Sequence, residues 1–246
     1  MTKGIDRMKG GKSPLISCIV PTLNSARYLG EALSSIRGQT HGEIELIVVD
    51  AGSSDTTIDI VRREFPGARV LIVLGCSPSA ARNAGIRSAN GTFLAFLDSD
   101  DLWYPQKLEL QLSHFRQNPG LDASITLVET FWAEGLEHEQ RVVGETFRGG
   151  TIPGYATTTL MAPRATFERF GVLEEDRWYT DAAEWFERVR RLGGVVEVLP
   201  EILLKRRIHE NAITRRGAEK SREEWLTFLK SELSQREVER SHDSRP

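Results

Sequence analysis

The sequence is poor in cysteine. It has two, Cys18 and Cys76, and neither belongs to a CxxC pair, which argues against a disulfide framework and against a structural zinc site. It also lacks any continuous apolar run of the roughly 18 to 20 residues that a membrane helix needs, and its polar N-terminus lacks the apolar core of a secretory signal. We therefore expect a cytoplasmic protein with no integral membrane segment and a disordered N-terminus over residues 1–13.

A strong charge of one sign is absent too. Of the 246 residues, 32 are basic and 35 acidic, and the net charge of −3 gives no general attraction to nucleic acid, so we expect no nucleic-acid partner. The stretch 10–13 (GGKS) imitates the end of a P-loop, but Asp6 stands where that loop requires its first glycine. GxGxxG, GxSxG and HExxH motifs are also missing. These absences argue against P-loop and dinucleotide-binding enzymes, common serine hydrolases and zinc proteases.

The first hundred residues alternate two kinds of periodicity. Four short runs consist of branched, apolar residues: 16–20, 44–49, 70–74 and 93–97. The segments between them repeat apolar residues at helical spacing: 28–36, 58–65 and 79–89. Apolar strands covered on both faces and separated by helices are typical of βαβ units in a parallel, doubly wound sheet. The length suits one large α/β domain with additions.

The second half of the sequence is less regular. We expect the following elements: a helix over 105–117, strands over 123–129 and 141–147, a helix over 180–192, a strand over 195–204 and a helix over 219–238. The last helix is charged and amphipathic, with an apolar stripe made of Trp225, Leu226, Leu229 and Leu233. Such a stripe could dock on a partner, join two chains into an oligomer or cover the sheet.

Ligands of a doubly wound sheet bind beyond the carboxyl ends of its strands. The first strand is followed by Pro21, Thr22 and Asn24, and the second ends at Asp50, where a nucleotide's ribose or base would lie. We expect Asn24 or Ser25 to cap the helix that follows the first strand, and Ser54 or Asp55 to cap the next.

The fourth strand runs directly into the sequence Asp98-Ser99-Asp100-Asp101. Two carboxylates one residue apart at a strand end can converge on one side of a bend. Magnesium or manganese is often held by one or two carboxylates together with substrate phosphates. The alternative is a turn that only caps the helix near Pro105.

Four segments in this order and spacing resemble the family 2 glycosyltransferases: 17–24 (SCIVPTLN), 47–56 (IVVDAGSSDT), 81–86 (ARNAGI) and 91–101 (GTFLAFLDSDD). The resemblance runs from about residue 16 to 111 and then intermittently to about 214. It implies a GT-A fold, which is a doubly wound, mostly parallel, Rossmann-like sheet flanked by helices. The second half would be an irregular acceptor side that ends in a C-terminal helix.

The resemblance also implies roles on the donor side. Pro21 and Thr22 would line the nucleoside pocket beside Asp50, and Arg82 would face the nucleotide or diphosphate rather than lie on a helix surface. Asp98 would contact the ribose or a metal-bound water, Asp100 would be the direct metal ligand, and Asp101 would cap the following segment.

One departure from the family pattern limits what can be carried over to the donor side. Many relatives have a second aspartate where this sequence has Ala51, so a preference for uracil is not carried over.

The segment 180–188 (TDAAEWFER) resembles the family's acidic helix with a tryptophan, in which an aspartate four residues before the Trp acts as general base. That position is Asp181, which we prefer to Glu184 as the base. Here the departure is Thr180, where relatives carry a glutamate. The alternative is a helix cap at Asp181 that Glu184 completes as a capping box.

Related enzymes carry an Arg-x-His element near Arg207 and His209. The resemblance implies that His209 reaches the metal or diphosphate and that an arginine such as Arg207 binds donor phosphates. The weakest expectations concern the sugar and acceptor cleft. They assign Trp103, Thr158, Glu184 and Trp185 to it, with core packing as the alternative for both tryptophans.

We therefore expect a single catalytic domain over 14–215, with a nucleotide-binding half (14–104), an acceptor-binding half (105–215) and a C-terminal amphipathic helix and tail over 216–246. The expected reaction is an inverting sugar transfer from a nucleoside-diphosphate sugar, with Mn²⁺ or Mg²⁺ as cofactor. The acceptor is a saccharide, lipid-linked molecule, peptide or small molecule. A sugar nucleotidyltransferase and a non-catalytic nucleotide- or carbohydrate-binding module remain as alternatives.

Overall fold

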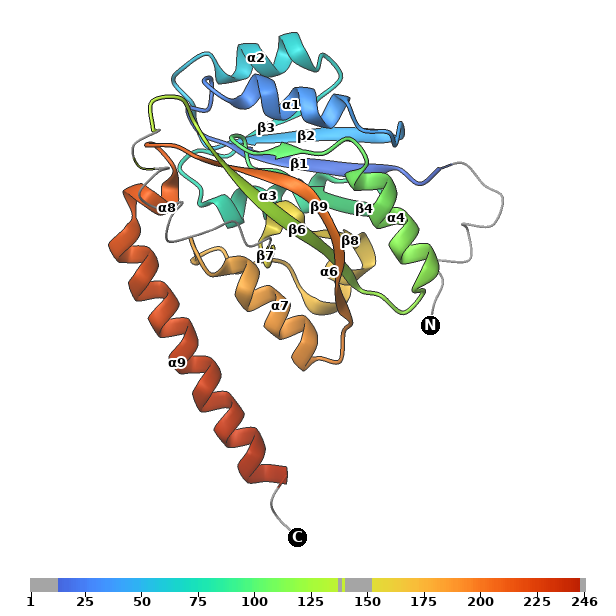
Figure 1. Ribbon diagram of the computed structural model, residues 1–246, viewed down its shortest axis with the longest axis vertical. Coiled ribbons are helices and arrows are strands. Elements are labelled where there is room, and N and C mark those ends of the chain that lie inside the picture. Colours follow the sequence, from blue (N-terminus) through green and yellow to red (C-terminus); the bar gives the residue numbers. More distant parts are fainter. Residues whose placement is uncertain (1–12, 137–138, 140–151, 244–246) are drawn as a thin grey trace.

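The computed structural model describes residues 13–136, 139 and 152–243, and Figure 1 shows a twisted sheet flanked by helices with one long helix at the C-terminal end. Two sequence predictions fall almost wholly outside this part of the chain. They are the disordered N-terminus over 1–13, of which only Ser13 is described, and the strand over 141–147.

The first half folds as the alternating pattern predicts. Strands β1 (Ile16–Thr22), β2 (Ile44–Asp50), β3 (Arg69–Ile72) and β4 (Phe93–Phe96) pair in parallel in the order β3-β2-β1-β4. β3 differs from expectation, because it is the edge strand and none of its residues is buried. The parallel register sets Thr22 beside Asp50, so the ends of β1 and β2 meet at one edge of the sheet.

The second half extends the same sheet with mixed pairing. Its strands are β5 (Leu102–Trp103), β6 (Ala123–Trp132), β7 (Ile152–Pro153), β8 (Met161–Pro163) and β9 (Val196–Ile208). β8 joins β4 to β6 through antiparallel pairs, β6 and β9 run parallel, and β9 carries β5 at the outer edge. The parallel sheet therefore continues into a mixed one after β4.

Helices cover both faces of the sheet and enclose two apolar cores (Figure 1). One face carries α1 (Leu29–Arg37), α2 (Thr57–Glu64) and α4 (Lys107–Gln117). The other face carries α3 (Pro78–Ser88), α6 (Arg164–Phe170) and α7 (Asp181–Arg191). Alternate residues of β1 point into the two cores, as in a strand covered on both sides: Cys18 lies in one and Ile19 in the other.

The loops at the helix starts differ from the predicted caps. α1 has Tyr28 at its N-cap without a side-chain hydrogen bond, so neither Asn24 nor Ser25 caps it. Asn24 adopts a left-handed backbone conformation (φ 49°) instead, which asparagine tolerates better than most residues. At α2 the N-cap is Thr56, again without a side-chain hydrogen bond, so neither Ser54 nor Asp55 is the cap, although the Asp55 carboxylate accepts the backbone N–H of Thr57.

The C-terminal helices are α8 (Ile213–Arg216) and α9 (Ala218–Asp243), with a short 3₁₀ turn, η2 (Thr157–Thr159), elsewhere in the second half. In Figure 1, α9 runs away from the sheet, so of the three alternatives for its stripe, covering the sheet is wrong. The stripe residues Leu226, Leu229 and Leu233 are exposed, and Phe228 is the one buried side chain among those described in α9. No helix in the described part of the chain is long and apolar enough to span a bilayer.

Candidate active site

The loops after β1 and β2 are fastened together through Asp50, which is 2% exposed. Its Oδ1 accepts the hydroxyl of Thr22 at 3.1 Å, and its Oδ2 accepts the backbone N–H groups of Gly52 at 3.0 Å and Ser53 at 2.8 Å. Both carboxylate oxygens are therefore engaged within the protein. Asp50 sits at the predicted strand end, and its carboxylate shapes the loop there.

Asn24 joins the same two loops. Its backbone N–H donates to Ser53 Oγ at 2.8 Å, and its Oδ1 accepts the backbone N–H of Ser54 at 2.9 Å. Ser25 Oγ lies 2.8 Å from Ser99 Oγ, which connects this edge to the turn after β4. The three strand ends that the sequence singled out thus form one continuous rim, as parallel strands require.

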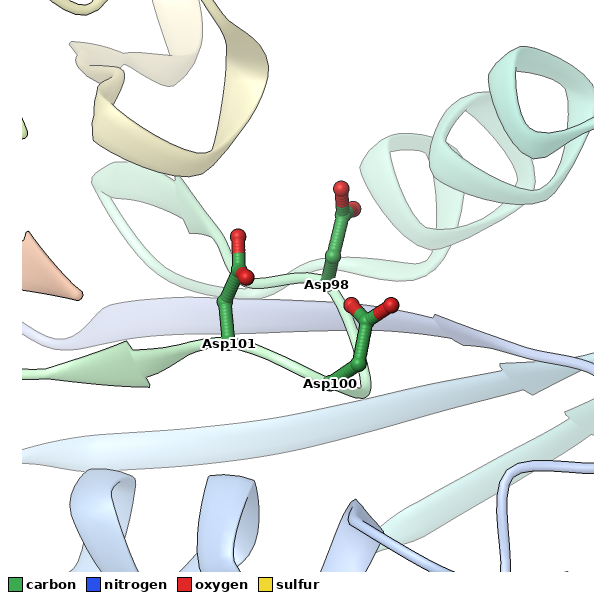
Figure 2. A group of neighbouring side chains, drawn as sticks. All are labelled: Asp98, Asp100 and Asp101. Atoms are coloured by element: carbon green, nitrogen blue, oxygen red, sulfur yellow. The ribbon is translucent and has the colours of Figure 1, made fainter. Parts of the chain in front are cut away.

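The turn after β4 gathers three carboxylates. Figure 2 shows Asp98, Asp100 and Asp101 projecting to the same side of the turn, and one potential ligand atom of each lies within 4.8 Å of the others. Burial, and then the negative charges of Asp100 and Asp98, raise the pKa of Asp101 well above its ordinary value. Burial also raises the pKa of Asp98, against the opposing effect of Arg82. Hard carboxylate oxygens with mutual repulsion suit Mg²⁺ or Mn²⁺, so these residues fit a divalent cation.

Strand β9 supports this turn from the C-terminal half. His209 Nε2 lies 2.8 Å from Asp100 Oδ2, which brings the predicted histidine to the predicted ligand. The backbone N–H of Arg207 donates to Asp101 Oδ1 at 2.9 Å. Asp101 therefore binds β9 and does not cap the following segment, so that expectation is wrong.

Arg207 is placed differently from its predicted role. Its guanidinium donates to the carbonyl of Asp100 and to Glu31, each at 2.9 Å, and packs over the rings of Tyr28 and Phe131. The guanidinium is therefore engaged in contacts within the protein that hold the aspartate turn, which differs from the predicted contact with donor phosphates.

Arg82 connects the aspartate turn to the other predicted catalytic segment. One terminal nitrogen lies 2.6 Å from Asp98 Oδ1, and the other lies 3.1 Å from Asp181 Oδ2. The side chain is 7% exposed, so Arg82 is not a helix-surface residue. Burial acts to lower its pKa, but the two carboxylates outweigh burial and raise it. Arg82 therefore remains a cation between Asp98 and Asp181.

Asp181 is the first residue of α7 and is 7% exposed. Its Oδ2 accepts from Ser79 Oγ at 3.0 Å and from Arg82, whereas its Oδ1 has no hydrogen-bond partner among the described residues. The N-cap of α7 is Thr180, and Glu184 binds Arg188 through two contacts of 2.9 Å. The capping-box alternative is therefore wrong. The sequence holds no local signal for the contact with Ser79, which lies 102 residues away.

The residues predicted to contact sugar or acceptor do not face an open cleft. Trp185 is fully buried, stacks on Phe167 and donates its indole N–H to the carbonyl of Gly171. Trp103 is 4% exposed and donates its indole N–H to the carbonyl of Thr158, which is itself 4% exposed. Core packing is therefore the role of both tryptophans, and the prediction for Thr158 is wrong for the same reason.

Glu184 is also unavailable to an acceptor, because it is buried and paired with Arg188. An aromatic residue that sequence reasoning missed is Trp178, which is 48% exposed and stands three positions before Asp181. Nothing in the local sequence separates an exposed tryptophan in a loop from a buried one.

Comparison with known proteins gives a family match. A family model for glycosyl transferase family 2 matches residues 17–174. An uncharacterized glycosyltransferase of Rickettsia typhi is 30% identical over 236 residues, which span 89% of this chain and 72% of that protein. TuaG of Bacillus subtilis, a glycosyltransferase assigned to teichuronic acid biosynthesis, is 28% identical over 241 residues, which span 93% of this chain and 90% of TuaG.

Two solved structures share the fold. Residues 1–349 of TarS from S. aureus, in complex with UDP-GlcNAc, give a TM-score of 0.64 at 20% identity over 80% of this chain and 60% of that one. The mannosyltransferase PcManGT from Pyrobaculum calidifontis, in complex with GDP-Man and Mn²⁺, gives a TM-score of 0.61 at 21% identity over 83% of this chain and 61% of that one. At these identities the likeness establishes the GT-A type of fold.

Proposed function

Because this chain belongs to glycosyl transferase family 2 and is a glycosyltransferase, we propose that it moves one sugar from a nucleoside diphosphate to an acceptor hydroxyl with inversion at the anomeric carbon. The observation that carries the proposal is the bridge that Arg82 makes between Asp98 and Asp181. Arg82 thereby pairs both with Asp98, which we assign to the donor side, and with Asp181, which we assign to the acceptor side. The family match sets aside the nucleotidyltransferase and the non-catalytic module.

On the donor side, Asp100 would hold a divalent cation, with Asp98 and His209 beside it. The crowding of three carboxylates supports this assignment: Arg82 pairs with the carboxylate of Asp98, and His209 Nε2 lies 2.8 Å from Asp100 Oδ2. The bound cation would offset the charge that develops on the departing nucleoside diphosphate. The Mn²⁺ in the PcManGT complex favours manganese as the first ion to test.

The nucleoside would lie along the rim formed by the loops after β1 and β2. Pro21, Thr22 and Asn24 line this rim, and Asp50 shapes it through its contacts with Gly52 and Ser53. The structural relatives hold a uridine nucleotide in one complex and a guanosine nucleotide in the other. Ala51 stands at the position of the family's second aspartate, so the donor screen below is designed to identify the nucleotide base of the donor.

On the acceptor side, Asp181 would take the proton of the attacking hydroxyl. Its Oδ2 is anchored by Ser79 and Arg82, which leaves Oδ1 to accept a proton. As the acceptor oxygen bonds to the anomeric carbon, the bond from that carbon to the diphosphate breaks and the electron pair leaves with the diphosphate. A single displacement of this kind inverts the anomeric carbon and needs no covalent enzyme intermediate.

A donor screen tests the proposal. The chain is incubated with UDP-, GDP- and dTDP-linked hexoses, with MnCl₂ or with EDTA, while thermal unfolding and release of the nucleoside diphosphate are followed. We expect one nucleotide class to raise the unfolding temperature and to release its diphosphate only with the metal. Metal-independent binding would remove the metal assignment, and the absence of binding or turnover with every donor would remove the proposed donor class.

A further inference from the structure

A carboxylate on the C-terminal helix holds the loop that leads into Asp181. Glu224 of α9 accepts the backbone N–H groups of three consecutive residues, Trp178 at 3.2 Å, Tyr179 at 2.9 Å and Thr180 at 2.8 Å. It also accepts the hydroxyl of Thr180 at 2.8 Å. One side chain therefore satisfies four donors in the segment directly before the proposed base.

Helix α3 holds the same loop through its side chains. Ser77 Oγ donates to the carbonyl of Glu175 at 2.6 Å, and Asn83 Nδ2 donates to the carbonyl of Leu173 at 2.8 Å. Ser79 Oγ lies 2.7 Å from the carbonyl of Arg177 as well as 3.0 Å from Asp181. The loop is thus fastened through its carbonyls to α3 and through its N–H groups to α9.

The contact with α9 is built as a charged anchor. Partial burial acts to raise the pKa of Glu224, but the hydrogen bonds from Tyr179, Thr180 and Trp178 outweigh it and lower the pKa, so the group is ionised at neutral pH. Phe228, one turn further along α9, is 5% exposed, and the guanidinium of Arg177 lies over its ring. Thr180 is fully buried, so loss of Glu224 would leave its hydroxyl and N–H without this acceptor.

We propose that Glu224 is a positioning residue of the transfer reaction, acting through the backbone of residues 178–180 to set where Asp181 stands. The inference rests on the proposed role of Asp181 as base. The proposal gives α9 a role in the reaction. This helix projects from the rest of the domain (Figure 1), yet its Glu224 accepts the backbone N–H groups of the three residues that precede α7. A displacement of about 1 Å at a reacting group can cost roughly a hundredfold in rate.

The test is a double-mutant cycle on the full chain, with the UDP- or GDP-hexose that turns over in the donor screen as probe. Glu224→Ala and Glu224→Gln are compared with Glu223→Ala, a neighbouring exposed glutamate on α9 that makes no side-chain contact with the loop among the described residues. Each is measured for kcat and KM of sugar transfer to water or acceptor, in the native and Asp181→Asn backgrounds, below the unfolding temperature of every variant.

We expect Glu224→Ala to lower kcat about 10- to 100-fold with the KM for the donor within twofold of the parent. Glu224→Gln, whose amide oxygen still accepts N–H groups, should retain an intermediate kcat, and Glu223→Ala should match the parent. In the Asp181→Asn background the loss caused by Glu224→Ala should disappear, because both changes remove one function. An equal loss in both backgrounds, a loss confined to donor KM, or an unchanged kcat would overturn the positioning role. If Asp181→Asn itself keeps full turnover, the result contradicts the proposed role of Asp181 as general base rather than the positioning role of Glu224.

Discussion

The aspartate turn (98–101) and the start of α7 (180–184) both present a carboxylate to Arg82, yet the charges around the two carboxylates differ. In the turn, three carboxylates lie within 4.8 Å of one another. At the start of α7, Glu184 is paired with Arg188, and Asp181 is anchored through one oxygen only. Crowded like charges favour a cation, whereas a single anchored carboxylate with an uncommitted oxygen suits a proton acceptor. The difference supports a division of labour between donor binding and acceptor activation.

The largest effect should come from Asp181→Asn, which removes the proton acceptor but keeps the shape of the side chain. We expect kcat to fall roughly 10²- to 10⁴-fold, with binding of the nucleotide sugar unchanged in calorimetry. Turnover close to that of the parent would show that Asp181 is not the base. The proposed difference in function between the two regions would then be lost.

The converse change is Asp100→Ala in the aspartate turn. Donor binding in the presence of MnCl₂ should weaken about a hundredfold, to the level that the parent shows with EDTA, because the cation loses its principal carboxylate ligand. Calorimetric titration of the parent and the variant, each with MnCl₂ and with EDTA, measures this. Glu187→Ala removes a half-buried carboxylate of α7 that pairs with Arg190, outside the turn, and serves as the matched control. A metal response that survives in Asp100→Ala contradicts the assignment.

Arg82→Lys should affect both regions at once, so that donor binding and catalysis are weakened together. Lysine keeps the charge but cannot present two separate N–H groups to Asp98 and Asp181 in the same geometry. We expect donor affinity and kcat each to fall by about tenfold, which corresponds to about 1.4 kcal/mol apiece. A loss confined to one of the two quantities would show that Arg82 serves that region alone.

The smallest effect concerns the pH dependence of stability at the start of α7. The lowered pKa of Glu224 means that its contribution to the free energy of unfolding is present above the pKa of an ordinary glutamate, about 4.3, and is lost as the pH falls through the lowered value. Urea unfolding should show Glu224→Ala about 1 kcal/mol less stable than the parent at pH 7. The difference should shrink as the pH falls through the lowered pKa of Glu224, whereas Glu223→Ala should match the parent throughout. A difference that persists at acid pH would assign the effect to packing.

The sequence is sufficient to place the ends of β1, β2 and β4 because its pattern is local. Branched apolar runs separated by helical periodicity fix the parallel strands, and parallel strands bring Thr22, Asp50 and Asp98 to one edge whatever the rest of the chain does. The helix that begins at Asp181 is equally legible from its periodicity.

The surroundings of Asp181 and of the three tryptophans depend on contacts between residues far apart in the sequence. A short segment does not reveal whether an indole faces solvent, so the buried Trp103 and Trp185 could not be told from the exposed Trp178. The capping-box spacing of Asp181 and Glu184 was ambiguous because Arg188 was an equally good partner for Glu184.

The sequence by itself therefore determined the strand ends and the aspartate turn, since backbone periodicity and the geometry of a parallel sheet suffice to place them. Only the tertiary structure decided the partners of the Asp181 and Glu224 carboxylates. Arg82 meets Asp181 across 99 residues, and Glu224 meets Thr180 across 44. Such pairs exist because α3 and α9, which are far apart in the sequence, pack beside one loop. The packing of whole helices depends on the shape of the assembled core, which a local pattern does not encode.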